Sequence, residues 1–235
     1  MTFLNLLKAA QVQNESMLCV GLDPDMAKLP AHLPKNREAV FDFCASIVDF
    51  TADLVCSFKP QIAYFAAMGA EAELERLVRH IRDVAPQVPV ILDAKRGDIG
   101  STAEQYAVEA FERYGADAVT LSPLAGQDIA APFLLYPGKA VVMTCHSSNQ
   151  AARVIQHHPD ESDPLYVRIV RETQLWATPD QLLLEVGTSD PAVLAQVRRA
   201  APERVLMLRS IWSEEERLDG LLEAGLNQAA DGLLL

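Results

Sequence analysis

The sequence lacks an apolar run of about 18 residues, the length that a helix needs to cross a bilayer. Its first residues, MTFLNLLKAAQVQNES, also lack the basic end and the small-residue cleavage site of a secretory signal. Basic residues are outnumbered, with 20 Lys and Arg against 32 Asp and Glu, and no Lys/Arg-rich run offsets the net charge of −12. Such a charge repels a phosphate backbone. We therefore expect a cytoplasmic protein whose partners include neither a membrane nor a nucleic acid.

Cysteine is scarce, and no two cysteines form a C-x-x-C pair, which excludes the usual signs of a disulfide framework or a zinc site. The four are Cys19, Cys44, Cys56 and Cys145. We expect all of them to be buried thiols. Adjacent histidines, His157 and His158, lie near Asp160, but adjacent side chains on a turn diverge and no third ligand is indicated. We therefore predict a solvated loop there and no metal site.

Half of the residues are apolar, and short aliphatic runs alternate with longer stretches of helical spacing. The eight candidate strands are residues 17–23, 54–59, 88–95, 117–122, 139–145, 181–187, 204–210 and 231–235. Helical patterns follow each of the first seven, including stretches near 36–54, 68–84 and 101–114. Eight βα units in fewer than about 250 residues indicate an α/β fold of the (β/α)8 TIM barrel type. A doubly wound open sheet is the competing architecture.

No linker divides the chain, so we predict one barrel domain over residues 1–235. The longest connection, residues 147–164, is polar and is placed where a barrel carries ligand contacts or a lid. The chain ends at Leu235, inside its last apolar run and without a helix to cover that strand. We expect the natural polypeptide to continue beyond this residue. A fused second enzyme is one alternative for the added segment.

Charged residues follow three consecutive strands at the point where catalytic groups of a barrel gather. Asp23 ends the first strand and Lys59 the second, each in phase with inward positions. Asp93 and Lys95 share a face of the third strand, and Asp98 follows in the next loop. A lysine among carboxylates is a positioned proton donor. The alternative is an ion-pair network without catalysis, which is the usual meaning of a single Asp-x-Lys match.

The sequence at these positions resembles the orotidine 5′-phosphate decarboxylase family. Residues 93–102 read DAKRGDIGST, which is similar to the family signature D-x-K-x-x-D-I in the D-A-K-R-G-D-I-G form of a bacterial subgroup. The likeness extends to GLDP, FKPQ with Phe65, GADAVT and SSN, at residues 21–24, 58–61, 115–120 and 147–149. It covers about the first two thirds of the chain. Barrels that decarboxylate sugar-acid phosphates carry a similar run and depend on magnesium.

The resemblance implies catalytic roles for four residues. Lys95 protonates C6 of the pyrimidine as carbon dioxide leaves, and Asp93 lies against the substrate carboxylate while holding Lys95. Asp98 enters the active site of a partner subunit, which implies a homodimer with shared sites. Lys59 completes the charge network and binds ribose hydroxyls. A fixed ammonium would stabilise the carbanion character that develops at C6 more than it stabilises the ground state.

The resemblance also implies substrate-binding roles and no cofactor. Asp23 binds the ribose with Lys59, Ser148 contacts the pyrimidine edge, and Thr102 reaches across the dimer toward the ribose. The last third departs from the family pattern, because strand seven ends LRSIW at residues 208–212 where most members have P-G-x-G-A-Q-G. Gln150 stands where the subgroup usually has proline. Arg209 is in phase with inward positions of strand seven, so it either binds the substrate phosphate or forms a structural ion pair.

Three other positions have open interpretations. Glu185 points inward on strand six and needs a partner that the sequence does not name. His146 ends strand five, with a place at the site, in the core or at the surface. Ser189 or Asp190 caps the helix that begins at Pro191.

The family resemblance, together with the charged residues at the strand ends, implies an enzyme that converts orotidine 5′-phosphate to uridine 5′-phosphate and carbon dioxide, the last step of uridylate synthesis. The enzymatic rival is a magnesium-dependent sugar-phosphate decarboxylase on the same barrel. The non-catalytic rival is a dimerisation barrel within a longer polypeptide.

Overall fold

The computed structural model describes residues 1–209 and 232–234, and it contains eight parallel strands in sequence order. The strands are β1 Cys19–Leu22, β2 Ser57–Pro60, β3 Ile91–Arg96, β4 Ala118–Leu121, β5 Ala140–His146, β6 Leu182–Gly187, β7 Leu206–Arg209 and β8 Gly232–Leu234. The bounds of each strand lie within three residues of those predicted. The helix predicted after β7 lies outside the described residues.

The strands form two ladders that neighbour each other. One joins β1 to β2, and the other runs in the order β3 to β8. Isolated parallel bridges, Phe58 to Val90 and Gln61 to Asp93, connect β2 with the segment of β3. Within the described residues, 1–209 and 232–234, strand β8 does not pair with β1. The single strand order, without a reversal point, is that of the predicted barrel and not of a doubly wound sheet.

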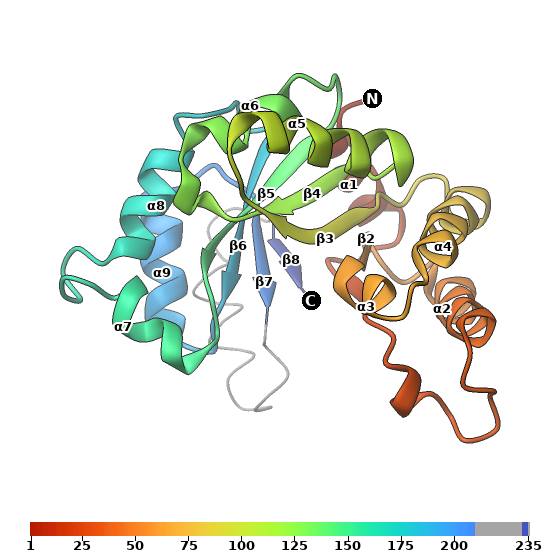
Figure 1. The fold of residues 1–235 in the computed structure, drawn as a ribbon. Coiled ribbons are helices and arrows are strands. Elements are labelled where there is room, and N and C mark those ends of the chain that lie inside the picture. The colour runs from red at the N-terminus through yellow and green to blue at the C-terminus, as the bar shows by residue number, and fades with distance from the viewer. Residues whose placement is uncertain (210–231, 235) are drawn as a thin grey trace.

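Helices pack around the strands, with α2 and α4 together on one side and α8 and α9 together on the other (Figure 1). The longer helices are α2 Arg37–Thr51, α4 Glu71–Val84, α5 Gly100–Val108, α8 Leu165–Thr173 and α9 Pro191–Ala200. The shorter ones are α3 Ile62–Ala67, α6 Ala131–Leu134 and α7 Arg153–Gln156. A full helix after β4 was predicted, but α6 has only four residues. Pro123 and Pro132 with Gly126 break this stretch into short 3-10 turns and one helical turn.

Helix α1, Phe3–Gln13, precedes the first strand and was not predicted. Its apolar positions Phe3, Leu7 and Ala10 follow helical spacing and are fully buried. They pack in one cluster with residues of the strand interior, including Cys19, Ile91, Ala118, Val142, Leu183 and Met207. Phe3 N donates to Gly138 O before β5, at 2.8 Å. Helix α1 therefore closes the barrel at the end where the strands begin.

A second and larger apolar cluster fills the layer between the strands and the outer helices. All four cysteines are free and buried, as predicted, and burial raises the pKa of the Cys19 thiol to about 11. Asp190 caps α9 by accepting from Ala192 N at 2.8 Å, with Pro191 at the first helical position, as predicted. Within the described residues, no helix is long and apolar enough to cross a membrane.

Candidate active site

Asp93 is the centre of a charged cluster at the ends of β2 and β3. Its Oδ2 accepts from Lys59 Nζ at 2.7 Å, and its Oδ1 accepts from Lys95 Nζ at 2.6 Å. Lys59 and Asp93 are completely buried, whereas the Lys95 side chain is 36% exposed. The strand-end geometry therefore brings these three predicted residues together, and it leaves the Lys95 ammonium accessible from the barrel mouth.

Thr120 of β4 is part of the same cluster and was not predicted. Its hydroxyl donates to Asp93 Oδ1 at 2.8 Å and accepts from the backbone N–H groups of Ala94 and Lys95, both at 2.9 Å. Its place on β4 follows from alternation, but its partners lie on another strand. The sequence signal was an inward threonine in the run DAVTLS. Thr120 thus fixes both the carboxylate and the backbone that carries the lysine.

The backbone at Lys95 departs from regular strand geometry. Lys95 has a φ of 45°, in the left-handed region that side chains other than glycine rarely adopt. The register between β3 and β4 shifts between Leu92 and Arg96, which gives the strand a bulge. Strained backbone of this kind persists where surrounding contacts hold it, and it concentrates at functional sites.

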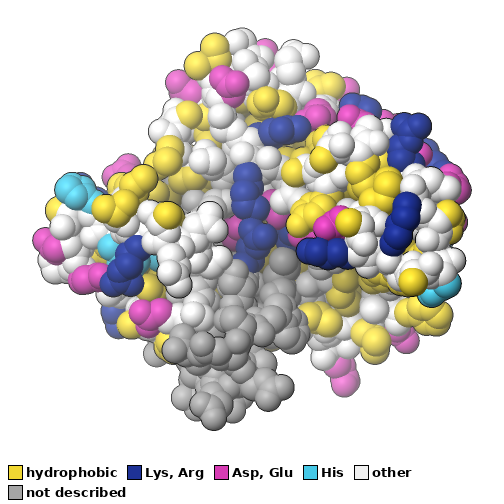
Figure 2. Space-filling model, turned by 60° about the horizontal axis from the view of Figure 1, so that its bottom comes forward, with side chains coloured by type: hydrophobic (Ala, Val, Ile, Leu, Met, Phe, Trp, Pro, Cys, Tyr) yellow, Lys and Arg dark blue, Asp and Glu magenta, His cyan; other side chains and the backbone are white. Residues whose placement is uncertain are grey.

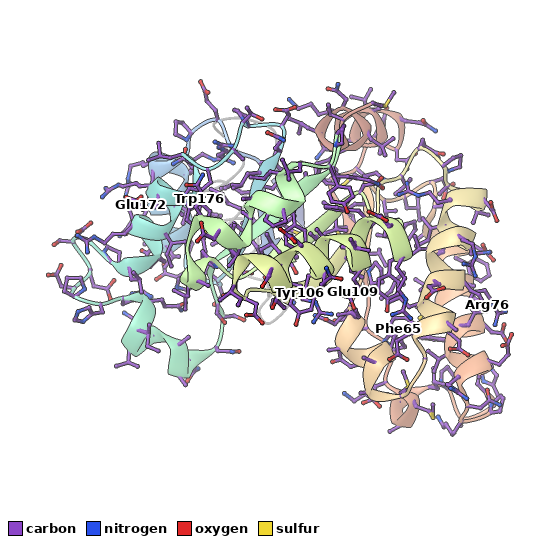
Figure 3. All side chains as sticks on the ribbon, turned by 45° about the horizontal axis from the view of Figure 1, so that its top comes forward. Phe65, Arg76, Tyr106, Glu109, Glu172 and Trp176 are labelled. Carbon is purple, nitrogen blue, oxygen red and sulfur yellow. The ribbon has the colours of Figure 1, made fainter. Side chains whose placement is uncertain are left out.

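Arg96 anchors the outer side of this bulge. Its guanidinium donates to Glu109 Oε2 at 2.7 and 3.2 Å and stacks over the Tyr106 ring at 4.3 Å. Tyr106 and Glu109 lie along α5 and the turn that follows it, where Figure 3 labels them. The bulge is therefore held from outside by Arg96 and from inside by Thr120.

The electrostatics of the cluster favour an ionised Asp93. Burial by itself raises the pKa of this carboxyl, but the Lys59 and Lys95 ammonium groups and their hydrogen bonds outweigh burial. The pKa of Asp93 is consequently held well below its ordinary value. A negative charge fixed between two cations is the arrangement needed to aim the Lys95 ammonium.

Glu185 and Arg209 add a second ion pair beside the first. Arg209 Nη1 donates to Glu185 Oε1 at 2.7 Å, so Arg209 is the partner that the sequence could not name. Arg209 Nη2 lies 3.7 Å from Asp93 Oδ2, and Lys95 Nζ lies 3.8 Å from Glu185 Oε1. Burial lowers the pKa of Arg209, but Glu185, Asp93 and Asp23 outweigh it and raise that pKa. The ion pair expected as one of two readings of Arg209 is present.

A cavity of about 610 Å³ opens over these groups. Its lining includes Lys95, Glu185 and Arg209, and it also includes Ser148 and His146 from the end of β5 and the loop beyond. Figure 2 looks onto the face toward which β6, β7 and β8 point, and it shows basic and acidic side chains together at its centre. The site has the size and polarity for a small anionic ligand.

Asp23 lies just past β1 and is reached by solvent. Partial burial at the barrel mouth raises its pKa, and the Asp93 charge adds to this, while Lys59, Arg209 and Lys95 oppose it. Asp23 makes no ion pair with these lysines within 4 Å, but it lies in their field.

Asp98 and Thr102 do not line the cavity of their own chain. Asp98 is exposed in the loop after β3, where its Oδ1 accepts from Ile99 N at 2.7 Å, and Thr102 is half-buried in the first turn of α5. Ile99 and Leu124, on neighbouring loops, are 69% and 73% exposed.

The loop after β5 is held by side-chain hydrogen bonds that the sequence did not indicate. Gln156 holds the Ser147 backbone through both amide atoms, at 3.0 and 2.8 Å, and its Nε2 lies 3.1 Å from His146 Nε2. His146 is buried at the cavity wall, and burial lowers its pKa. The loop predicted to be solvated is exposed from His158 onward, whereas the His157 side chain is only 9% exposed and packs against His146 and Tyr166. His158 is exposed.

No group of three or more His, Cys, Asp or Glu side chains with metal-binding geometry occurs in the described parts of the chain. Asp93 and Glu185 are instead engaged by lysine and arginine.

Comparison with known proteins places this geometry in a family. The model of the "Orotidine 5'-phosphate decarboxylase / HUMPS family" matches residues 16–175. A Dechloromonas aromatica protein named orotidine 5′-phosphate decarboxylase is 50% identical over 236 residues, covering 100% of this chain and 87% of the relative. A Polaromonas naphthalenivorans protein of the same name is 52% identical, covering 98% and 83%.

Solved structures agree with the sequence matches. The structure of Leishmania donovani OMP decarboxylase is 35% identical and has a TM-score of 0.87, covering 100% of this chain and 88% of that one. The likeness extends over all eight strands, which confirms the predicted (β/α)8 barrel. On the family match, the sequence identity and the shared fold, this chain belongs to the orotidine 5′-phosphate decarboxylase / HUMPS family.

Proposed function

We propose that this chain converts orotidine 5′-phosphate to uridine 5′-phosphate and carbon dioxide, the last step of uridylate synthesis. The observation that carries the proposal is the Lys95 ammonium, held 2.6 Å from a buried carboxylate and facing a cavity of nucleotide size. The names of relatives at about half identity support the same reaction. The expected cytoplasmic location is part of this proposal.

Lys95 is the proposed acid. As the bond between C6 and the carboxylate breaks, carbon dioxide leaves and the electron pair remains on C6. The Lys95 Nζ then gives a proton to C6, and solvent returns a proton to the lysine. The ammonium charge stabilises the developing carbanion, and Asp93, ionised and buried, keeps that ammonium in place. No step uses electrons from a redox partner.

The remaining polar groups are proposed to bind the nucleotide. Lys59 and Asp23 take the ribose hydroxyls, and Ser148 takes the pyrimidine edge. Arg209 is the proposed phosphate ligand, because its guanidinium lines the cavity and presents several donors to an anion. Since Glu185 already accepts one of these donors, its phosphate contact has to use the others.

We also propose a homodimer with shared active sites. Asp98 is exposed outside its own cavity, and apolar side chains at Ile99 and Leu124 lie on the same group of loops. In a two-fold dimer each copy would offer Asp98 and Thr102 to its partner reciprocally. Burial of the exposed apolar pair would contribute to the interface.

The reaction is tested by the absorbance change of orotidine 5′-phosphate, with and without a chelator. Turnover that is unaffected by chelator supports the proposal, which needs no metal and no organic cofactor. Loss of turnover on chelation, restored by magnesium, would favour the sugar-phosphate decarboxylase. Nucleotide binding without any turnover would favour the non-catalytic barrel.

A further inference from the structure

Glu185 and Arg209 supply two of the five charged groups that meet at the barrel mouth, beside Lys59, Asp93 and Lys95. They come from adjacent strands, and the register places Gly187 of β6 opposite Arg209 of β7. Glu185 is 2% exposed and has no part in the reaction proposed above. A buried carboxylate at an active site needs a reason, because its desolvation is costly.

The hydrogen-bond capacity of the two carboxylates is used unequally. Both oxygens of Asp93 have partners, whereas Glu185 Oε2 is buried and accepts no hydrogen bond from residues 1–209 or 232–234. At the surface, Arg76 binds Glu38 through both oxygens, at 2.7 and 3.0 Å. An ion pair that served stability alone would be expected to close in this two-fold way.

Each member of the pair also has a competing partner within 4 Å. Arg209 Nη2 is 3.7 Å from Asp93 Oδ2, and Lys95 Nζ is 3.8 Å from Glu185 Oε1. Both distances are about 1 Å longer than a charge-assisted hydrogen bond. Without Glu185, the guanidinium would move to Asp93 and compete with the lysines. Without Arg209, Glu185 would draw Lys95 away from Asp93.

We propose that Glu185 and Arg209 are positioning residues, and that each keeps the other from binding a member of the Lys95–Asp93 pair. Glu185 holds the guanidinium away from Asp93, and Arg209 holds the carboxylate away from Lys95, so the ammonium stays on Asp93. The functional part of this inference rests on the proposed decarboxylation, in which Lys95 is the acid.

The test compares Glu185→Gln, Arg209→Gln and the double variant with the wild type. Each single variant is expected to lower kcat at least tenfold, because one charge remains without its partner. The double variant is expected to have a higher kcat than either single variant, although it also lacks the proposed phosphate contact of Arg209, because Lys95 and Asp93 then have no competitor. Any phosphate contact of Arg209 appears separately, as a raised KM in both Arg209 variants.

The control is the surface pair of Glu38 and Arg76, where Figure 3 labels Arg76 on the outer helix α4. Glu38→Gln with Arg76→Gln should leave kcat unchanged. A double variant as slow as the slower single variant would overturn the proposal. Coupling in the thermal midpoint with kcat unchanged in every variant would also overturn it, by showing a structural pair only.

Crystal structures of the single variants test the geometry without any turnover. Arg209 is expected within hydrogen-bond distance of Asp93 in Glu185→Gln, and Lys95 on Glu185 in Arg209→Gln. An unchanged Lys95–Asp93 contact in both would refute the inference even if the wild type decarboxylates. An inactive wild type with the expected shifts would refute the proposed function alone. If either glutamine variant fails to fold, Glu185→Asp and Arg209→Lys provide the same comparison.

Discussion

Removal of the Lys95 ammonium tests the proposed reaction most directly. Lys95→Ala deletes both a proton donor and a fixed positive charge that faces the cavity. A positioned general acid contributes about 10²–10⁴ in rate, and a preorganised charge contributes about 10²–10³. These effects overlap because they belong to one group, so we expect kcat to fall by about 10⁴, equal to about 5–6 kcal/mol of activation free energy.

The folded state should tolerate this change. Asp93 keeps Lys59 at 2.7 Å and Thr120 at 2.8 Å after Lys95 is removed, so its carboxylate is not left bare. The Lys95 side chain is also partly exposed, so its burial contributes little. We expect a loss of about 1–2 kcal/mol in unfolding free energy. Uridine 5′-phosphate should still bind within about tenfold of wild type.

The assay is single-turnover absorbance with enzyme in excess, together with product binding by calorimetry and a urea unfolding curve. Lys28→Ala, at an exposed lysine paired with Asp25, is the matched control and should retain wild-type kcat. A Lys95→Ala protein that is folded and binds product, but turns over within tenfold of wild type, would refute Lys95 as the acid.

Four further outcomes are expected. Mixed dimers refolded from inactive Lys95→Ala and Asp98→Ala chains should regain activity, since one site collects both defects; inactivity of mixed dimers verified by native mass spectrometry would contradict shared sites. Arg209→Ala should weaken binding of uridine 5′-phosphate at least tenfold more than binding of uridine, and equal losses would leave Arg209 as an ion-pair residue only. Thr120→Val should lower kcat about tenfold at nearly constant KM, because the bulge loses its inner support, and an unchanged kcat would count against this. The low pKa of Asp93 means that its ionised form stabilises the fold above about pH 4 and that this stability is lost as pH falls toward the folded-state pKa, so the stability advantage of wild type over Asp93→Asn should shrink below about pH 4; an advantage that grows on acidification would contradict the assignment.

Alternation of apolar runs was enough to predict all eight strands, because strands such as β2, β4 and β6 are buried on both faces and such strands read as short aliphatic segments. The same reasoning placed Lys59, Asp93 and Lys95 together, since parallel strands end at one edge. Helix α1 escaped prediction because it is not part of a βα unit. Its apolar positions fit any amphipathic helix, and only the structure shows that they cover the end of the barrel where the strands begin.

The parts of the site that were missed depend on contacts between distant residues. Thr120 is 27 positions from Asp93, and Glu185 is 24 positions from Arg209. Phase alone showed that Arg209 and Glu185 point inward, but it could not show that they meet. The left-handed backbone at Lys95 was equally hidden, because lysine carries no preference for that conformation.

Helix α1 closes the end of the barrel where the strands begin, and this affects the strength of the electric field at the mouth. Asp93 and Lys95 rise directly from Ile91, which is packed with Phe3 and Leu7 of α1 in a layer that polarises weakly. Because this apolar layer screens charges weakly, water at the open mouth supplies most of the screening, and the electric field of the charged cluster is directed outward to the ligand. A cut that removed the first dozen residues would admit water beneath the charges. It would weaken the pull on an anionic substrate while leaving every charged side chain in place.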